Sequence, residues 1–272
     1  MVATVRGTVH EHYGLPLQDA AGIVGNPESG EGVIAISVAD GHGDAQHARS
    51  ARGAELAVKV AGAVATEAAQ DLAEARSVDE VSSMARSVLI PALNVRWRDA
   101  VGEDLADNPV EVNDHGRGRA PDSLLLYGTT LLVAILAFPW LVLCQIGDGD
   151  IVVVDMDGLA ERPVPGDPTL DGQHTTSMCQ RDAERAFRYS VMDLRSRPVA
   201  VLLLATDGFG NAQTVQPWHQ QVGADVVHLA RERGIEWIER QLPVWVARCA
   251  SGEGSGDDTS MALLMRHDLA SV

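Results

Sequence analysis

The sequence has few cysteines, and none of them lie close together in the chain. Cys144, Cys179 and Cys249 are the only three. An odd, widely spaced set excludes a disulfide framework, and no Cys-x-x-Cys pair is present to bind zinc. The N-terminal residues, MVATVRGTVHEHYG, also lack the apolar core of a signal peptide. Both absences predict a protein of the reducing cytoplasm.

Positive charge is scarce as well. Against 38 Asp and Glu there are 21 Lys and Arg, so the formal net charge is −17 and the pI is about 4.8. Because nucleic acids and anionic lipids attract Lys and Arg, this balance argues against both as partners. Hydrophobic residues make up 46% of the chain, which is enough for a sizeable core. We expect a single domain over residues 1–272.

One long apolar run must be distinguished from a membrane span. Residues 124–144 carry no charge and are long enough to cross a bilayer. Gly128 and Pro139 interrupt the run, and the proline is typical of a turn between two apolar stretches. β-branched residues are frequent here and in the next run, 151–154. We therefore predict buried strands rather than a transmembrane helix.

The hydrophobic pattern predicts both helices and strands. Helical spacing of apolar residues predicts helices at 44–75, 78–100, 181–194, 217–232 and 235–249. Short apolar runs predict strands at 33–39, 125–136, 140–146, 150–155, 199–205 and 260–266. The polar segments 102–122 and 157–179 are predicted to be mainly loop. Because the strands do not alternate with helices, we expect an α+β fold with mainly antiparallel sheets.

Aspartates recur at the ends of these strands, beside glycine. They occur in DGHG at 40–43, GDGD at 147–150, TDG at 206–208 and GDDTS at 256–260, and Asp19 lies ahead of the strand at 33–39. A single Asp-Gly is usually a turn. Several carboxylates at one edge repel each other unless cations neutralise them. Since Mg²⁺ and Mn²⁺ prefer oxygen ligands, the pattern predicts a divalent metal site.

These motifs together resemble a known family. QDA at 18–20, DGHG, GTT at 128–130, GDGD, TDG and GDDTS resemble, in order and spacing, the metal-dependent protein phosphatases of the protein phosphatase 2C type. TTSM at 175–178 followed by RDAERAFR is similar to the variant bacterial branch. The resemblance covers nearly the whole chain. It implies a four-layer αββα sandwich, in which two antiparallel sheets are flanked by helices.

The resemblance also implies an activity. It is the hydrolysis of phosphoserine and phosphothreonine in proteins by a water that bridges two Mn²⁺ or Mg²⁺ ions. The implied partner is a phosphorylated protein, the substrate of a serine/threonine kinase, and the implied setting is signalling in the cytoplasm. His42 matches the proposed general acid, which would protonate the leaving oxygen and contribute on the order of 10²–10⁴ in rate.

Metal ligands follow from the resemblance position by position. The implied set is Asp19, Asp40, Gly41, Asp148, Asp207 and Asp257. Asp40 would bridge both metals, with the Gly41 carbonyl on one of them. Asp207 and Asp257 correspond to the first metal, whereas Asp19, and more weakly Gln18, correspond to the second. A third, weaker metal would be held by Asp148 together with Asp207.

Some positions depart from the family pattern. Gly14 lies where the family usually has an Arg that binds the substrate phosphate, and Gln18 replaces a common Glu. The weak candidates to replace that Arg are Arg6, His10 and His12. Asp258 stands where many members have Asn, and it is assigned no ligand role.

These departures leave two alternatives open. One is a catalytically impaired protein with the phosphatase fold, which binds phosphoproteins or a regulator. The other is a small-molecule phosphatase on the same fold. A cysteine phosphatase is disfavoured, because the residues between Cys179 and Arg185 include no glycine to wrap a phosphate.

Overall fold

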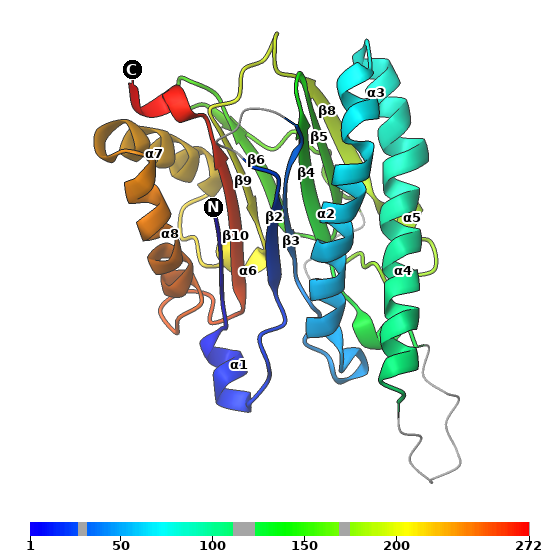
Figure 1. The fold of residues 1–272 in the computed structure, drawn as a ribbon. Helices are drawn as coiled ribbons and strands as arrows, with labels where there is room; N and C mark the ends of the chain where they lie inside the picture. The colour runs from blue at the N-terminus through cyan, green and yellow to red at the C-terminus, as the bar shows by residue number, and fades with distance from the viewer. Residues whose placement is uncertain (27–31, 111–122, 169–174, 272) are drawn as a thin grey trace.

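Two antiparallel sheets of five strands lie face to face in the computed structural model, which describes residues 1–26, 32–110, 123–168 and 175–271 (Figure 1). The first sheet has the order β1 (Val2–Val5), β10 (Thr259–Met265), β9 (Val201–Ala205), β6 (Asp150–Val154) and β7 (Ala160–Glu161). The second has the order β2 (Ala20–Val24), β3 (Ile34–Ala39), β4 (Leu131–Ala137), β5 (Trp140–Ile146) and β8 (Arg188–Asp193).

Helices cover the outer face of each sheet. The α-helices of the described residues are α1 (Thr8–Tyr13), α2 (Ser50–Glu74), α3 (Val78–Met84), α4 (Ile90–Asp107), α5 (Ala183–Ala186), α6 (Asp207–Asn211), α7 (Trp218–Arg233) and α8 (Ile235–Cys249). Short 3₁₀ or π turns are η1 (Ala45–His47), η2 (Ala85–Leu89), η3 (Leu125–Tyr127) and η4 (His267–Ser271). Helix α2 contacts β2, β3 and β4, while α7 contacts β6 and β7, and α8 contacts β1 and β10 (Figure 1).

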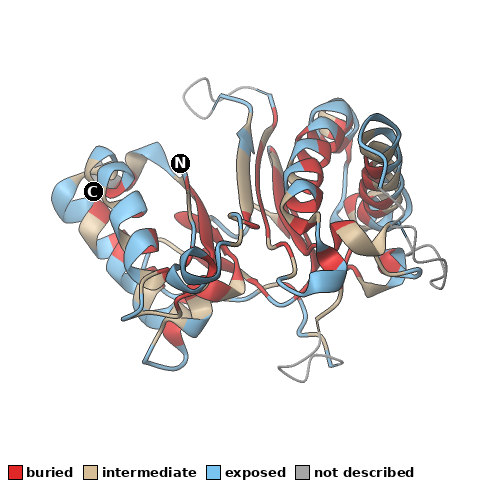
Figure 2. Ribbon diagram, turned by 90° about the horizontal axis from the view of Figure 1, so that it is seen from below, coloured by how far each residue is buried: buried red, intermediate tan, exposed pale blue. Residues whose placement is uncertain are grey.

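Apolar side chains fill three layers, which explains the long apolar runs in the sequence. On β3, Ile36 and Val38 point between the two sheets, whereas Ala35 and Ala39 point toward the helices. Side chains alternate across a strand, so a sheet covered on both faces needs apolar residues at every position. Figure 2 shows the buried residues concentrated on the strands and on the helix faces that meet them. The predicted αββα sandwich is confirmed.

Most predicted elements are present, but the assignment over 181–194 was wrong, and β1, β2, β7, α1 and α6 were not predicted. The helix predicted over 181–194 is helical only in α5, and β8 follows it as a strand paired with β5. Tyr189 and Val191 alternate along β8 and pack on the helix-side core. That contact, together with hydrogen bonding to β5, outweighs the local helical pattern. The strand predicted from residue 125 starts at Leu131, because η3 precedes it.

The predicted loops and the apolar run can also be compared with the structure. Helix α4 continues to Asp107, into the segment predicted as loop over 102–122, and residues 111–122 lie outside the described residues. Residues 169–174 of the second predicted loop lie outside them as well. The run at 124–144 forms η3, β4 and β5. Among the described residues, no helix has the length and apolar character that a membrane crossing needs.

Strand register brings the aspartate motifs to one end of the sandwich. In the second sheet Ala20, the first residue of β2, pairs with Ala39, the last residue of β3. Asp19, which precedes β2, and Asp40, which follows β3, therefore lie at the same end. In the first sheet Ala205 pairs with both Asp150 and Met261. The segments around 207, 148 and 257 therefore emerge at neighbouring strand ends. Helix α1 lies below the strand ends in Figure 1, and α6 follows β9 directly.

Candidate active site

The GTT motif fixes the backbone of Asp40. The hydroxyl of Thr130 accepts a hydrogen bond from the Asp40 amide (2.9 Å), and the Thr130 amide donates to the Asp40 carbonyl (2.8 Å). The hydroxyl of Thr129 donates to the same carbonyl (2.9 Å). At Gly41 a Cβ would lie 2.6 Å from the Gln18 carbonyl oxygen. Only glycine fits this crossing, which explains the Asp-Gly pair physically.

Asp19 is held from the opposite sheet by a residue of the TDG motif. The Thr206 hydroxyl donates to Asp19 Oδ2 (2.8 Å) and accepts from the Ser260 amide (2.9 Å). One hydroxyl thus connects three motifs. The other oxygen of Asp19, Oδ1, is buried and has no hydrogen-bond partner. An unpartnered buried carboxylate oxygen is costly for the fold unless a cation or proton satisfies it.

Three carboxyl groups at this end share an electrostatic environment. Burial raises the pKa of Asp40 well above its ordinary value, and the charges of Asp19 and Asp207 raise it further. Burial likewise raises the pKa of Asp19, against the hydrogen bond from Thr206. The pKa of Asp207 is raised by burial and then by the charge of Asp148, although a hydrogen bond with Asp40 lowers it. The three groups favour protons or bound cations over a set of bare charges.

The GDGD turn between β5 and β6 places Asp148 beside this group. Gly147 has φ 106°, a conformation that glycine adopts readily. Gln145 Nε2 donates to the carbonyls of Gly147 (3.3 Å) and Gly149 (2.6 Å), so the turn is clamped from within. The neighbouring Asp150 differs from the three carboxyl groups above. Burial raises its pKa to about 6, but the Arg162 guanidinium, 2.8 Å away, opposes the shift.

His42 lies on the DGHG loop next to a second histidine. Its amide donates to the Gly128 carbonyl (3.1 Å), and its ring meets the His47 ring edge-on, with centroids 4.8 Å apart. His47 is oriented in turn by a contact of 2.5 Å between its Nδ1 and the Leu125 carbonyl oxygen. Burial, and then the charge of His47, lower the pKa of His42 to about 4. The ring is therefore neutral at pH 7 in the metal-free protein.

Asp148 and Asp257 are the more exposed members of the implied ligand set, and Asp257 lies nearer the surface than the buried Asp19. The Asp257 side chain is 49% exposed, and its Oδ1 accepts from the Asp258 amide (2.8 Å). Within the described parts of the chain, no three His, Cys, Asp or Glu side chains form a group that could hold a metal ion as they stand. Asp40 shares a hydrogen bond with Asp207 and also lies in the electrostatic field of Asp19 and Asp148.

A comparison with family models settles the classification of this arrangement. The sequence model of protein phosphatase 2C matches residues 6–247, nearly the whole chain. The chain belongs to the protein phosphatase 2C family. It is therefore a metal-dependent protein phosphatase. A comparison with curated protein sequences finds no match.

Solved structures of bacterial phosphatases share the fold. The serine/threonine phosphatase Stp1 from Staphylococcus aureus is 17% identical, with a TM-score of 0.59, covering 98% of this chain and 94% of that one. The S. agalactiae serine/threonine phosphatase is also 17% identical, with a TM-score of 0.58 and coverage of 98% and 99%. A bacterial serine phosphatase is 19% identical, with a TM-score of 0.56 and coverage of 97% and 95%.

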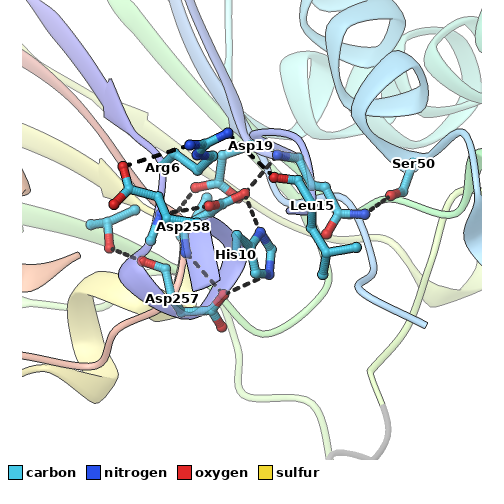
Figure 3. A network of polar contacts seen from close by, with 12 residues as sticks. Arg6, His10, Leu15, Asp19, Ser50, Asp257 and Asp258 are labelled. Carbon is cyan, nitrogen blue, oxygen red and sulfur yellow. Dashed lines mark hydrogen bonds and ion pairs between the residues drawn. The ribbon is translucent and has the colours of Figure 1, made fainter. Parts of the chain in front are cut away.

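The structure separates the three candidates for the missing phosphate-binding Arg of the 2C family. Arg6 contacts Glu11 at 3.7 Å, and His12 is exposed on α1. His10 is buried, and its ring lies beside two aspartates (Figure 3). Gly14, at the position of the missing Arg, ends α1 with φ 69°, so that backbone favours glycine and not an Arg.

Sequence reasoning missed several residues that shape this end of the phosphatase fold. Thr206 and His47 were assigned no role of their own, yet they orient Asp19 and contact His42. A weak signal existed for each, since Thr206 precedes the aspartate of TDG and His47 lies shortly after His42 in the sequence. The Ser260 amide donates to the Thr206 hydroxyl, and Gln145 Nε2 donates to the Gly149 carbonyl. The contacts of Thr206 with Asp19 and Ser260 cannot be read from spacing, because these residues lie on or beside other strands.

Proposed function

We propose that this end of the sandwich hydrolyses phosphoserine and phosphothreonine in proteins with the help of two divalent metal ions. The observation that carries the proposal is the convergence of Asp19, Asp40 and Asp207, whose pKa values are all raised, first by burial and also by the charges of neighbouring aspartates. Keeping three carboxyl groups close together in a buried site is unfavourable for a fold unless cations bind there. Phosphatase chemistry uses such cations.

The residues present fit divalent metals by their donor chemistry. Carboxylate and carbonyl oxygens are the ligands that Mg²⁺ and Mn²⁺ prefer, and Asp19 Oδ1 is a buried oxygen with no partner. The residues that would hold the ions are Asp19, Asp40, Gly41, Asp207 and Asp257, with Asp148 and Asp207 at a third, weaker site. When bound, the ions would activate water and neutralise phosphate charge.

The side chains of this chain would supply positioning and a proton. Thr129 and Thr130 hold the Asp40 backbone, so the carboxylate is preorganised. His42 lies two residues further on, with its loop tied to Gly128. A phosphate dianion bound beside this ring would raise its pKa by opposite charge, and the protonated ring could then donate to the leaving oxygen.

The substrate side of the proposal is coarser. A phosphorylated protein, modified by a serine/threonine kinase, is the expected partner, and the scattered cysteines favour a cytoplasmic setting. The alternative hypothesis, a catalytically impaired phosphatase, is supported by Gln18. Its Nε2 donates to the Ser50 hydroxyl (2.6 Å) and to the His42 carbonyl (3.3 Å), so this amide is used for structure.

The decisive experiment measures phosphate release from a phosphoserine and a phosphothreonine peptide with Mn²⁺, with Mg²⁺ and with excess chelator. We expect turnover with metal and none in chelator. A phosphorylated metabolite at the same concentration tests the small-molecule alternative, and turnover confined to it would overturn the protein substrate. Binding of the phosphopeptides without turnover, at saturating Mn²⁺, would favour the impaired phosphatase instead.

A further inference from the structure

Asp258, the second aspartate of GDDTS, is one of the most deeply buried acidic residues of the described chain. Its side chain is only 3% exposed. Two amide donors and one histidine ring nitrogen surround it, all from the N-terminal segment (Figure 3). The Gly7 amide donates to Oδ1 (2.7 Å), and the Gln18 amide donates to Oδ2 (2.6 Å). His10 Nδ1 lies 2.9 Å from Oδ2. A buried carboxylate with this surrounding is anchored rather than free to bind a ligand.

His10 is placed between the two neighbouring aspartates. While Nδ1 faces Asp258, Nε2 lies 3.5 Å from Oδ1 of Asp257. The ring comes from α1, which lies below the strand ends of the sandwich (Figure 1). Gly7, at the start of α1, approaches so closely that a Cβ there would lie 2.3 Å from the Asp257 carbonyl carbon. The N-terminal segment is therefore seated directly on the C-terminal motif.

The two amide donors explain why this position holds Asp. A carboxylate offers two acceptor oxygens, and here each oxygen receives a different backbone amide. Asn offers one acceptor oxygen and a donor NH₂ group. In its place, one of the amides of Gly7 and Gln18 would face a donor and remain unpaired in a buried site, which is costly.

We propose that Asp258 and His10 form a latch that holds residues 7–18 on the C-terminal motif and thereby positions the carboxylates of Asp19 and Asp257. The chain connectivity gives the latch this role. Gln18, bound by Asp258, immediately precedes Asp19, and Asp257 immediately precedes Asp258. The latch thus joins carboxylates that the proposed function assigns to different metal ions, and its effect on metals rests on that function. Asp258 and His10 are positioning residues that touch no reacting atom.

The test uses Asp258→Asn, His10→Gln, the double variant and the matched control His12→Gln. His12 is the exposed histidine of the same helix. The first readout is amide hydrogen exchange at Gly7 and Gln18, measured by NMR in the metal-free proteins. We expect exchange at these amides to be at least about 10-fold faster in the Asp258 and His10 variants than in the control. Because it needs no metal and no activity, this readout is independent of the proposed function.

The second readout is Mn²⁺ binding, followed by EPR and calorimetry on the full chain. Loss of a residue that orients a ligand typically costs about 10- to 100-fold in metal affinity, and we expect such a loss in both single variants. The double variant should lose little more than either single one, because one latch is broken in each. His12→Gln should match the wild type in both readouts.

The outcomes separate this inference from the proposed function. If the wild type binds no Mn²⁺, the proposed function fails, and the metal part of the inference fails with it. If the wild type binds Mn²⁺ and both single variants bind it equally well, the inference alone is overturned. Unchanged amide exchange at Gly7 and Gln18 in folded His10→Gln would also overturn it, even if Asp258→Asn does not fold. Additive losses in the double variant would show two separate contributions and no latch.

Discussion

Carboxyl groups at the two places where this chain concentrates them behave in opposite ways. On the outer face of the helices, Glu67 is paired with both terminal nitrogens of Arg96 (2.5 Å each), and these bonds lower its pKa. At the strand ends, Asp19, Asp40 and Asp207 interact with hydroxyls and with one another, and burial raises their pKa. The same side-chain chemistry therefore favours the charged form in one place and disfavours it in the other.

The difference follows from how the few basic residues are distributed. With 21 Lys and Arg against 38 Asp and Glu, many acids must lack a basic partner. Arginines pair with exposed acids, as in Arg195–Asp193 (2.7 Å) and Arg266–Asp268 (2.5 Å). In the described part of the chain, no such ion pair reaches the three buried aspartates. External cations are the remaining source of positive charge, which is what a metal-dependent phosphatase requires.

The largest expected effect is on enzymatic activity, which should depend on an acid at the strand ends but not on an acid of the outer helix face. Asp207→Asn removes a charge that the proposed metal ions would need but keeps the shape, so we expect phosphopeptide turnover to fall by more than about 100-fold. Glu67→Gln removes an acid of the outer face and should leave turnover unchanged. The measurement is kcat/KM at saturating Mn²⁺. Equal rates in wild type and Asp207→Asn would remove the functional contrast between the two places.

A second substitution at the strand ends tests whether His42 is the general acid. His42→Ala should slow hydrolysis of a phosphoserine peptide by about 10²–10⁴-fold, because a poor leaving group needs a proton. An aryl phosphate with an activated leaving group should be affected much less. The ratio of the two kcat values is the measurement. If both substrates lose the same factor, His42 acts on binding or folding and is not the acid.

In chelator, replacing Asp40 by Asn should stabilise the metal-free fold, although most substitutions destabilise a protein. The folded-state pKa of Asp40 is raised, so the metal-free fold loses stability as pH rises from the ordinary range near 4 through that raised value. Asp40→Asn carries no charge and should melt higher than wild type at pH 7, by roughly 2–4 °C for about 1 kcal/mol. At acidic pH the two melting temperatures should converge.

Metal reverses this order. At 100 times the dissociation constant, bound Mn²⁺ stabilises wild type by about 2.7 kcal/mol, and the variant should gain less. Calorimetric melting of both proteins with and without Mn²⁺ checks the reversal. A wild type that melts above Asp40→Asn in chelator at pH 7 would contradict the repulsion between these carboxyl groups.

The smallest effect is expected on the outer face, with the opposite pH dependence. The lowered pKa of Glu67 contributes stability above its unfolded-state pKa, and that contribution is lost as pH falls through the folded-state value. The pair is fully exposed, so salt and water screen it. Glu67→Gln should change the melting temperature only slightly at pH 7, and not at all at low pH. A large loss at pH 7 would show that surface pairs carry real stability here.

Much of the fold could be predicted from the chain itself. Apolar runs such as 140–146 were recognised as strands because both faces of each sheet are covered, which leaves no polar alternation to misread. The strands β1 and β2 were not predicted, and β8 was assigned wrongly, because Arg188 to Asp193 lie in a segment with helical local character. The residues of β8 pair with residues of β5 that lie 43 to 53 positions earlier in the chain, and local pattern carries no information about this pairing.

The sequence by itself determined which chemistry is available: aspartates beside glycines at strand ends, too few basic residues to neutralise them, and motifs that resemble one family. Only the tertiary structure decided how these residues are held. The Thr206 hydroxyl reaches Asp19 across 187 positions, and Asp258 receives the Gly7 amide across 251. Such contacts depend on strand register and on the stacking of the two sheets. A change of register by one residue would turn these side chains to the other face, so no spacing along the chain can reveal them.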